Sequence, residues 1–245
     1  MALKIIKGNI FTSECQTLVN TINCVGVMGA GIALECRLRY PKMYSRYVTL
    51  CKEQKIDIGL LWLFKAPDKW VLNFPTKRHW KGSSEESFLH AGLQKFAQTY
   101  RERGVTSIAF PLLGADRGGI APSRSLEIMT EHLSTLDIDV EIYEYDPLAQ
   151  DDIYASTKSW LLSQNAADIA QSTSIRIDYV NKLIEAMQRS DIHQLNQLAR
   201  VEGVGIKTLE KIFVQARNQS YSEQETQQKR LFSSSKNITS LTSLR

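Results

Sequence analysis

The sequence predicts an α/β domain followed by a small all-α domain. From residue 1 to residue 147, short strand-like segments alternate with helix-like segments, which is typical of a layered domain with a largely parallel or mixed sheet. After Pro147 the composition becomes polar and then turns to an all-helical pattern. The chain of 245 residues is long enough for one core domain and a smaller second one.

The predicted strands are short apolar runs. The third and fourth of them flank Ala66-Pro-Asp and predict a β-hairpin, and the last alternates apolar and acidic residues, as in a strand near a sheet edge. The six runs are Leu3–Ile6, Gln16–Asn20, Leu60–Phe64, Trp70–Phe74, Val105–Phe110 and Val140–Tyr145.

The predicted helices are bounded by proline and glycine. Pro41 ends the first one because the residue before proline avoids the α region. The third is amphipathic and stops at Gly104, and Pro122 suits the first turn of the fourth. The four segments are Gly31–Tyr40, Met43–Lys52, Ser84–Arg103 and Pro122–Leu136.

Composition divides the rest of the chain. We expect residues 148–174 to form a linker, residues 175–217 a helical domain, and the Ser-, Gln- and Thr-rich residues 218–245 a flexible tail. The net charge of +4 permits an anionic partner without requiring one. No apolar run reaches about 18 residues and the N-terminus has no signal-peptide pattern, so we expect a cytoplasmic protein without a membrane span.

The four cysteines are Cys15, Cys24, Cys36 and Cys51. They form no CxxC pair and have no paired histidine nearby, which argues against a zinc site. We expect free thiols, mostly buried, and neither a metal nor a cofactor.

Two glycine-containing loops follow predicted strands. The first carries Asn20 and Asn23 and then Gly26, Gly29 and Gly31, whose spacing does not fit a dinucleotide-binding fingerprint. The second runs from Gly114 to Gly119 and holds Asp116 and Arg117. Each is either a tight turn or a cradle for a diphosphate, and the presence of both favours an elongated ligand that carries phosphate.

A third motif, Thr76-Lys-Arg-His-Trp-Lys, directly follows an apolar strand. It is either a solvated basic loop or part of a site at the carboxyl edge of the sheet, where α/β proteins bind ligands. A lysine in that position binds phosphate, or acts as a nucleophile if desolvation lowers its pKa.

Together these motifs resemble the macrodomain family, in residues 1 to about 147. Lys7-Gly-Asn-Ile is similar to its opening element, and the two glycine loops to its ligand loops. Met28-Gly-Ala-Gly-Ile-Ala and Asn73-Phe-Pro-Thr-Lys-Arg-His-Trp are similar to the branch of the DarG antitoxins and terminal ADP-ribose glycohydrolases. The resemblance implies a three-layer α/β/α fold with a mixed sheet, and removal of ADP-ribose from DNA bases or from protein carboxylates.

The resemblance also implies the roles of residues. Lys77 corresponds to the catalytic lysine of that branch, Asn20 and Asn23 to residues facing the distal ribose, and Ile10 to one near adenine. The remaining expected ADP-ribose contacts are Asn9, Gly29, Ala30, Gly31, Ile32, Thr76, Leu113, Gly114, Ala115, Asp116, Arg117, Gly118 and Gly119.

The sequence departs from the family in three places. Asn9 stands where the family has an acid, and Gly114-Ala-Asp stands where it commonly has Gly-Cys-Gly. Gly118 aligns with an aspartate of the protein glycohydrolases, and whether Asp116 replaces that aspartate stays open. The part after residue 147 is also shorter than in typical DarG proteins, which leaves binding of a cognate DNA ADP-ribosyltransferase toxin an open alternative.

The helical domain contains Val201-Glu-Gly-Val-Gly-Ile-Lys-Thr, which resembles a helix–hairpin–helix motif. There, backbone N–H groups hold a DNA phosphate without reading sequence. The expected DNA contacts are Gly203, Gly205, Lys207 and Lys211, and the alternative is a helical hairpin used only for packing. Three functions are therefore open: a glycohydrolase acting on ADP-ribosylated, preferably single-stranded DNA, a hydrolase acting on ADP-ribosylated protein, and a non-catalytic ADP-ribose reader.

Overall fold

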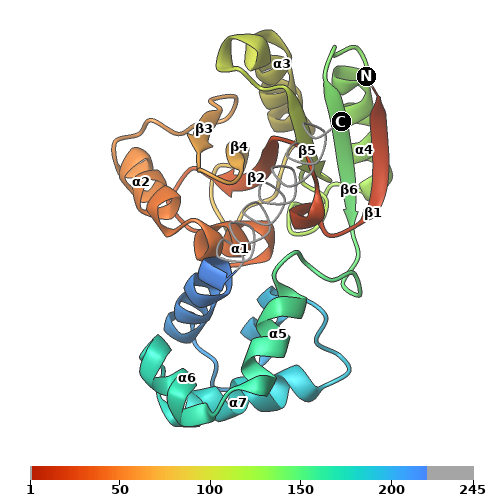
Figure 1. The fold of residues 1–245 in the computed structure, drawn as a ribbon. Helices are drawn as coiled ribbons and strands as arrows, with labels where there is room; N and C mark the ends of the chain where they lie inside the picture. The colour runs from red at the N-terminus through yellow and green to blue at the C-terminus, as the bar shows by residue number, and fades with distance from the viewer. Residues whose placement is uncertain (1, 220–245) are drawn as a thin grey trace, which may run out of the picture. The chain divides into compact units, whose positions relative to one another are not determined.

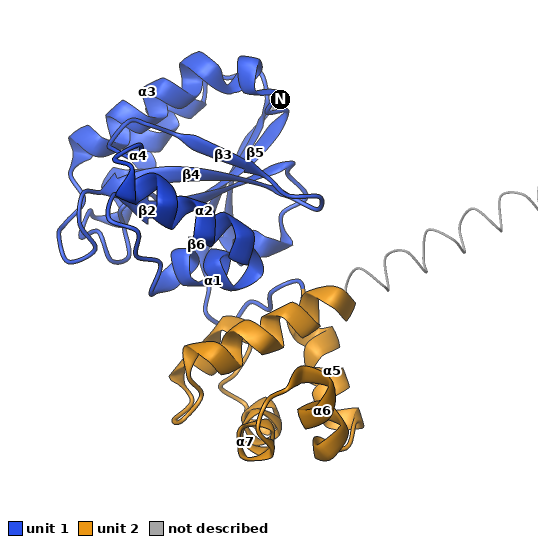
Figure 2. Ribbon diagram, turned by 90° about the vertical axis from the view of Figure 1, so that its left-hand side faces the viewer, with its two compact units in different colours: residues 1–152 blue, residues 153–245 orange. Residues whose placement is uncertain are grey.

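The computed structural model describes residues 2–219. The chain divides into two compact units, residues 1–152 and residues 153–245 (Figure 2). None of the helices described in these residues is long and apolar enough to cross a bilayer. The predicted tail, 218–245, lies almost entirely outside the described residues.

The first unit is built on a six-stranded mixed sheet with the order β1-β6-β5-β2-β4-β3 (Figure 1). Neighbouring strands are parallel except β3 and β4, which form the predicted antiparallel hairpin. The strands are β1 (Leu3–Gly8), β2 (Thr17–Asn23), β3 (Trp62–Lys65), β4 (Trp70–Lys77), β5 (Ser107–Pro111) and β6 (Asp139–Tyr145).

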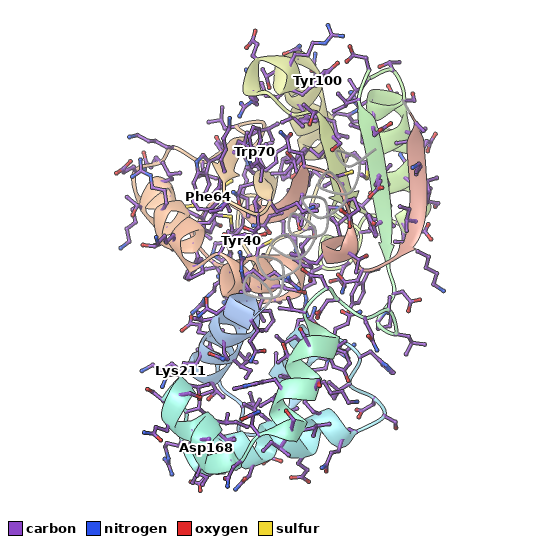
Figure 3. All side chains as sticks on the ribbon, viewed as in Figure 1. Tyr40, Phe64, Trp70, Tyr100, Asp168 and Lys211 are labelled. Carbon is purple, nitrogen blue, oxygen red and sulfur yellow. The ribbon has the colours of Figure 1, made fainter. Side chains whose placement is uncertain are left out.

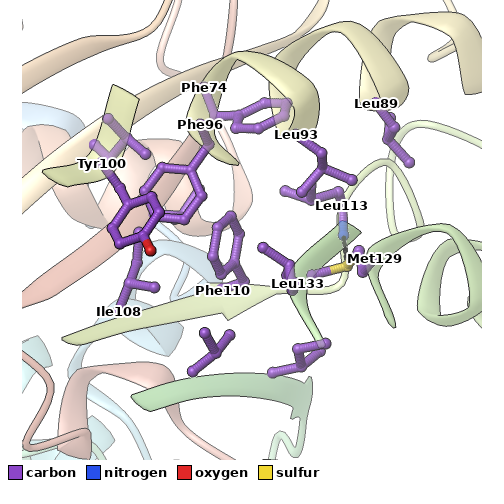
Figure 4. Packing of buried hydrophobic residues seen from close by; sticks show 14 of the residues in the cluster. Phe74, Leu89, Leu93, Phe96, Tyr100, Ile108, Phe110, Leu113, Met129 and Leu133 are labelled. Carbon is purple, nitrogen blue, oxygen red and sulfur yellow. Dashed lines mark hydrogen bonds between the residues drawn. The ribbon is translucent and has the colours of Figure 1, made fainter. Parts of the chain in front are cut away.

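Helices cover both faces of this sheet, which confirms the three-layer prediction. On one face, α3 (Glu86–Arg103) and α4 (Pro122–Leu133) pack against the strands through a core that includes Phe74, Phe96 and Phe110 (Figure 4). On the other face, α1 (Gly31–Arg39), α2 (Pro41–Lys52) and the short 3-10 helix η1 (Ile10–Thr12) enclose a second apolar core.

Four of the eight predicted helix ends agree with the structure, and the other four differ by one to three residues. Gly104 ends α3 in the left-handed conformation, with φ +76°. The N–H groups of Gly104 and Val105 donate to carbonyls in the last turn of α3. Pro122 is the first residue of α4. Pro41 ends α1 and is itself the first residue of α2, since proline at that position loses no helical hydrogen bond.

The sheet order decides where the glycine loops lie. β2 and β5 are parallel neighbours, so their carboxyl ends lie at the same edge of the sheet. The loop after β2 leads to α1 on one face, whereas the loop after β5 leads to α4 on the other. The two loops therefore diverge at the switch point of the sheet, where open α/β proteins bind their ligands.

The second unit is helical in its described part. Its elements are α5 (Tyr154–Ser163), α6 (Ala166–Thr173), α7 (Ile177–Gln188), the 3-10 helix η2 (Leu195–Arg200) and a helix over residues 206–219. The prediction of a linker at 148–174 is wrong, because α5 and α6 lie there. Leu161 and Ile169 are buried and anchor these helices, and the Asn165 side chain caps α6.

The four cysteines are free thiols, as predicted. Cys15 and Cys36 are buried, whereas Cys24 and Cys51 are only half-buried. Burial raises the pKa of the Cys24 thiol to about 11, so this group is a poor nucleophile at neutral pH.

Candidate functional site

The residues of the candidate site follow the carboxyl ends of the parallel strands. Asn9 comes after β1, Asn23 ends β2, Lys77 ends β4, and Gly114–Gly119 follow β5. The sheet thus brings to one edge motifs that are more than a hundred residues apart in the chain.

Asn23 organises the first loop from within. Its Oδ1 accepts hydrogen bonds from the N–H groups of Val25 and Val27, at 3.0 and 3.3 Å, while its Nδ2 donates to the Val27 carbonyl. The buried Tyr47 hydroxyl donates to the Asn23 carbonyl, at 2.7 Å. Asn23 therefore shapes the loop, a function that the sequence did not suggest.

Asn20 lies beneath the site. Its side chain is fully buried, and its Nδ2 donates to Oδ1 of Asn73, the residue opposite it on β4, at 2.9 Å. Leu113 is also fully buried and belongs to the apolar core. The structure places both side chains under the loops, away from the surface that they were expected to line.

The two glycine loops meet at Gly31 and Asp116. Gly31 has φ +55°, and a Cβ on it would lie 3.6 Å from Oδ2 of Asp116. Gly29 differs, because its φ is not positive and a Cβ there would have only an ordinary contact, 3.8 Å from Val27 Cγ1. The fold therefore does not require a glycine at position 29. A ligand that approaches the backbone closely would explain why glycine stands there.

The second loop is tightly folded on itself. A Cβ on Gly118 would lie 2.2 Å from the Gly114 carbonyl oxygen, so no side chain fits there. The Ile120 N–H donates to Gly114 and the Ser84 N–H to Gly118, at 3.0 and 2.9 Å. The Ser84 hydroxyl is buried and has no hydrogen-bond partner among the described residues. Sequence reasoning missed Ser84, which carries no motif.

Lys77 joins the third motif to the second loop. Its Nζ donates a hydrogen bond to the carbonyl oxygen of Arg117. Burial lowers the pKa of Lys77, the Arg117 guanidinium lowers it further, and Asp116 opposes both. The Cys24 N–H donates to the Arg78 carbonyl, at 3.1 Å, and so ties the first loop to the lysine segment.

The three predicted motifs thus form one cluster at the sheet edge. Around Lys77, Thr76 is buried, while the side chains of Asp116 and Arg117 are 86% and 70% exposed. Ala30 is the N-cap residue of α1 and Ile32 lies in the first turn of that helix, so both stand where the first glycine loop enters α1. A partly desolvated amine beside two glycine-rich loops suits nucleophilic chemistry on a ligand held by its phosphates.

Asn9 and Ile10 lie at the end of β1. The Asn9 side chain caps η1 by accepting a hydrogen bond from the Phe11 N–H at 2.9 Å. The Phe11 ring packs under the guanidinium of Arg39, with 4.0 Å between the guanidinium carbon and the ring centroid. Arg39 is itself held by Glu35, at 2.8 Å. Phe11 and Arg39 were not among the predicted site residues.

The hairpin of the second unit spans residues 201–205. Gly203 has φ +81°, a backbone conformation that favours glycine. Gly205 has no positive φ, and a Cβ there would lie in open space. Lys207 is exposed, but the Lys211 ammonium donates to the Ser174 carbonyl, after α6. Figure 3 labels Lys211, and Asp168 on α6. The Lys182 ammonium, which the sequence did not single out, donates to the Glu202 carbonyl at 3.3 Å.

Comparison with known proteins agrees with this fold. A family model described as "Macro domain" matches residues 19–129. The macrodomain of Thermus aquaticus DarG is 34% identical, with a TM-score of 0.56, and the match covers 98% of it and 58% of this chain. The first unit is a macrodomain. The second unit lies outside the residues that the family model matches, so the resemblance to a helix–hairpin–helix stays a prediction.

Curated relatives of this macrodomain include two named DNA ADP-ribosyl glycohydrolase. The one from Thermus aquaticus is 35% identical over 60% of this chain, and the one from Mycobacterium tuberculosis is 39% identical over 46%. The chain spans 41% and 33% of their lengths. A solved structure of Thermosipho africanus DarTG in complex with ADP-ribose is 34% identical, with a TM-score of 0.56, and the match covers 59% of this chain and 41% of that one.

Proposed function

We propose that this protein is a glycohydrolase that removes ADP-ribose from nucleobases in DNA. The observation that carries the proposal is the contact between Lys77 and the Arg117 carbonyl, which places an amine of lowered pKa against the second glycine loop. The names of the macrodomain relatives support the same substrate. An antitoxin role opposing a DNA ADP-ribosyltransferase is part of the proposal and is supported by the DarTG fusion relative, at 33% identity.

The loops supply binding and position. Gly29–Ile32 and Gly114–Gly119 present backbone N–H groups and the N-terminus of α1, which together suit a diphosphate. Asn9 and Ile10, at the end of β1, suit the adenine end of the ligand. The distal ribose then lies toward Lys77, at the far side of the two loops. Binding energy from the diphosphate fixes the sugar for attack.

Lys77 supplies the chemistry in this proposal. Its neutral amine attacks C1 of the distal ribose, and the bond from C1 to the nucleobase nitrogen breaks. The base leaves with that electron pair and takes up the proton that the attacking nitrogen loses. The bond from C1 to the ring oxygen then breaks and a second proton moves from nitrogen to that oxygen, which gives a Schiff base on Lys77. Water hydrolyses the Schiff base to release ADP-ribose and the free amine. The lowered pKa matters because only the deprotonated amine is nucleophilic.

The hairpin of the second unit is proposed to hold the DNA backbone. Gly205 supports this idea, because the fold leaves room for a Cβ there and yet the position is glycine. We expect Gly205→Val to weaken binding of the full chain to single-stranded DNA and to reduce the salt dependence of binding, with a small fall in melting temperature because valine is a poorer N-cap than glycine. Unchanged DNA affinity would favour a hairpin used for packing. Gly203→Val is a poorer test, since its φ of +81° strains any side chain.

A direct test offers the protein two substrates. The full chain is incubated separately with an ADP-ribosylated single-stranded oligonucleotide and with a protein ADP-ribosylated on carboxylates. Release of ADP-ribose from DNA, abolished in Lys77→Ala and retained in the exposed-lysine control Lys42→Ala, is the expected result. Release from the protein alone would favour the protein hydrolase. Binding of ADP-ribose without release from either substrate would favour a reader.

A further inference from the structure

Three exposed apolar side chains lie on the two loops that follow β2 and β4, where Asn23 and Lys77 are paired in the sheet. Trp80, Val25 and Val27 are 50%, 46% and 36% exposed. They come from two loops that are joined by the Cys24 N–H to the Arg78 carbonyl, at 3.1 Å. Exposed apolar side chains mean little singly, but a group of them at the edge of a site indicates a surface that a partner covers.

The loop holds Trp80 in an ordered setting. The His79 and Trp80 rings are stacked, with 5.7 Å between centroids and 30° between planes. The turn is closed by the Gly82 N–H on the His79 carbonyl, at 3.0 Å, and by the Lys81 N–H on His79 Nδ1, at 3.2 Å. The indole is therefore a prearranged surface on a short turn.

One ammonium group lies at this ring. The Lys81 ammonium lies 5.0 Å from the centroid of the Trp80 ring, and Arg78 forms an ion pair with Asp57 at 2.8 Å. Lys77 is only three residues away, which is at most about 10 Å of extended chain. An exposed aromatic face with an adjacent ammonium matches an unpaired nucleobase with its phosphate.

We propose that Trp80 stacks on a base that neighbours the modified nucleotide in single-stranded DNA, with Lys81 at the adjoining phosphate. The proposal rests on the proposed function and specifies its substrate as an unpaired oligonucleotide. A base offers its flat face only when it is taken out of a duplex, so a stacking residue beside the reacting centre selects single strands. A protein substrate has no base to place on the ring.

The first test compares substrates of different length. The full chain is assayed with an ADP-ribosylated oligonucleotide and with an ADP-ribosylated mononucleoside. Trp80→Ala is expected to raise KM for the oligonucleotide roughly 5- to 150-fold, the usual range for loss of one stacked base, and to leave the mononucleoside unaffected. Trp80→Phe is expected to recover most of the loss. An equal loss on both substrates, or none, would overturn the proposal.

The second test does not depend on turnover. Binding of an unmodified single-stranded oligothymidylate of roughly 12 nucleotides is followed by intrinsic fluorescence and by anisotropy of a labelled strand. We expect the oligonucleotide to quench the intrinsic fluorescence of the wild-type protein. In Trp80→Phe the quenching should disappear, while the affinity measured by anisotropy stays the same. If wild-type protein released no ADP-ribose from DNA but showed this quenching, the glycohydrolase proposal would fail and the stacking surface would stand. Trp80→Ala with wild-type anisotropy would remove the stacking surface instead.

Discussion

Gly118→Ala tests how the second loop is built. A Cβ there would lie 2.2 Å from the Gly114 carbonyl oxygen and 2.4 Å from the Ser84 hydroxyl. The first contact is with backbone, so no flexible side chain can give way. The Gly114–Gly118 segment must open, which strains the hydrogen bonds from Ile120 to Gly114 and from Ser84 to Gly118, at 3.0 and 2.9 Å.

The expected cost follows from these contacts. Overpacking costs about 1–3 kcal/mol and each lost hydrogen bond about 0.5–1.5 kcal/mol, while alanine recovers about 0.4–1 kcal/mol by restricting the unfolded chain. If the loop opens enough to lose one of the two hydrogen bonds, the net loss is about 2 kcal/mol. In a unit of this size it lowers the melting temperature by roughly 4–8 °C. ADP-ribose affinity should fall as well, because the loop that faces the diphosphate is displaced.

The assay is thermal unfolding of the full chain with and without ADP-ribose. The transition that ligand shifts upward reports the first unit. Gly29→Ala is the matched control, since a Cβ there has only an ordinary contact with Val27 at 3.8 Å. It should keep the wild-type melting temperature and still bind ADP-ribose less tightly. A Gly118→Ala protein that melts within about 1 °C of wild type would refute the packing argument, and full affinity in Gly29→Ala would refute the proposed role of that glycine.

Two further predictions concern pH. Arg117 lowers the pKa of Lys77 and Asp116 raises it, so Arg117→Gln should shift the rise of turnover to higher pH and Asp116→Asn to lower pH. Shifts in the same direction would contradict the charge argument. Nε2 of His132 on α4 lies 2.8 Å from Nδ1 of His90 on α3. Burial lowers the pKa of His132, and the neighbouring His90 lowers it further. Because the unfolded chain then binds more protons, stability should fall as pH drops below about 6.5, and urea titrations of His132→Gln should show a weaker fall.

The order of elements in the first unit was predictable from the sequence, because the apolar periodicity agrees with the positions of the prolines and glycines that bound the elements. The hairpin at Pro67, the stop at Gly104 and the start at Pro122 each rest on a local backbone preference. The prediction failed at 148–174, where helix formation depends on tertiary burial. Leu161 and Ile169 supply that burial within a polar segment.

The site was predictable in its position more than in the contacts of its side chains. Strand ends and glycine loops placed it, because parallel strands bring their carboxyl ends together. The roles of Asn20 and Asn23 were not predictable, since an asparagine that binds a ligand and one that binds Asn73 or Val27 look alike in a sequence.

The central claim is that Lys77 forms a covalent adduct during removal of ADP-ribose from DNA. The most direct measurement is to reduce the full chain with borohydride during turnover of an ADP-ribosylated single-stranded oligonucleotide and to map the product by mass spectrometry. The account predicts ADP-ribose attached to the peptide that contains Lys77, and no adduct in Lys77→Ala. Turnover without an adduct, together with undiminished turnover in Lys77→Ala, would contradict it.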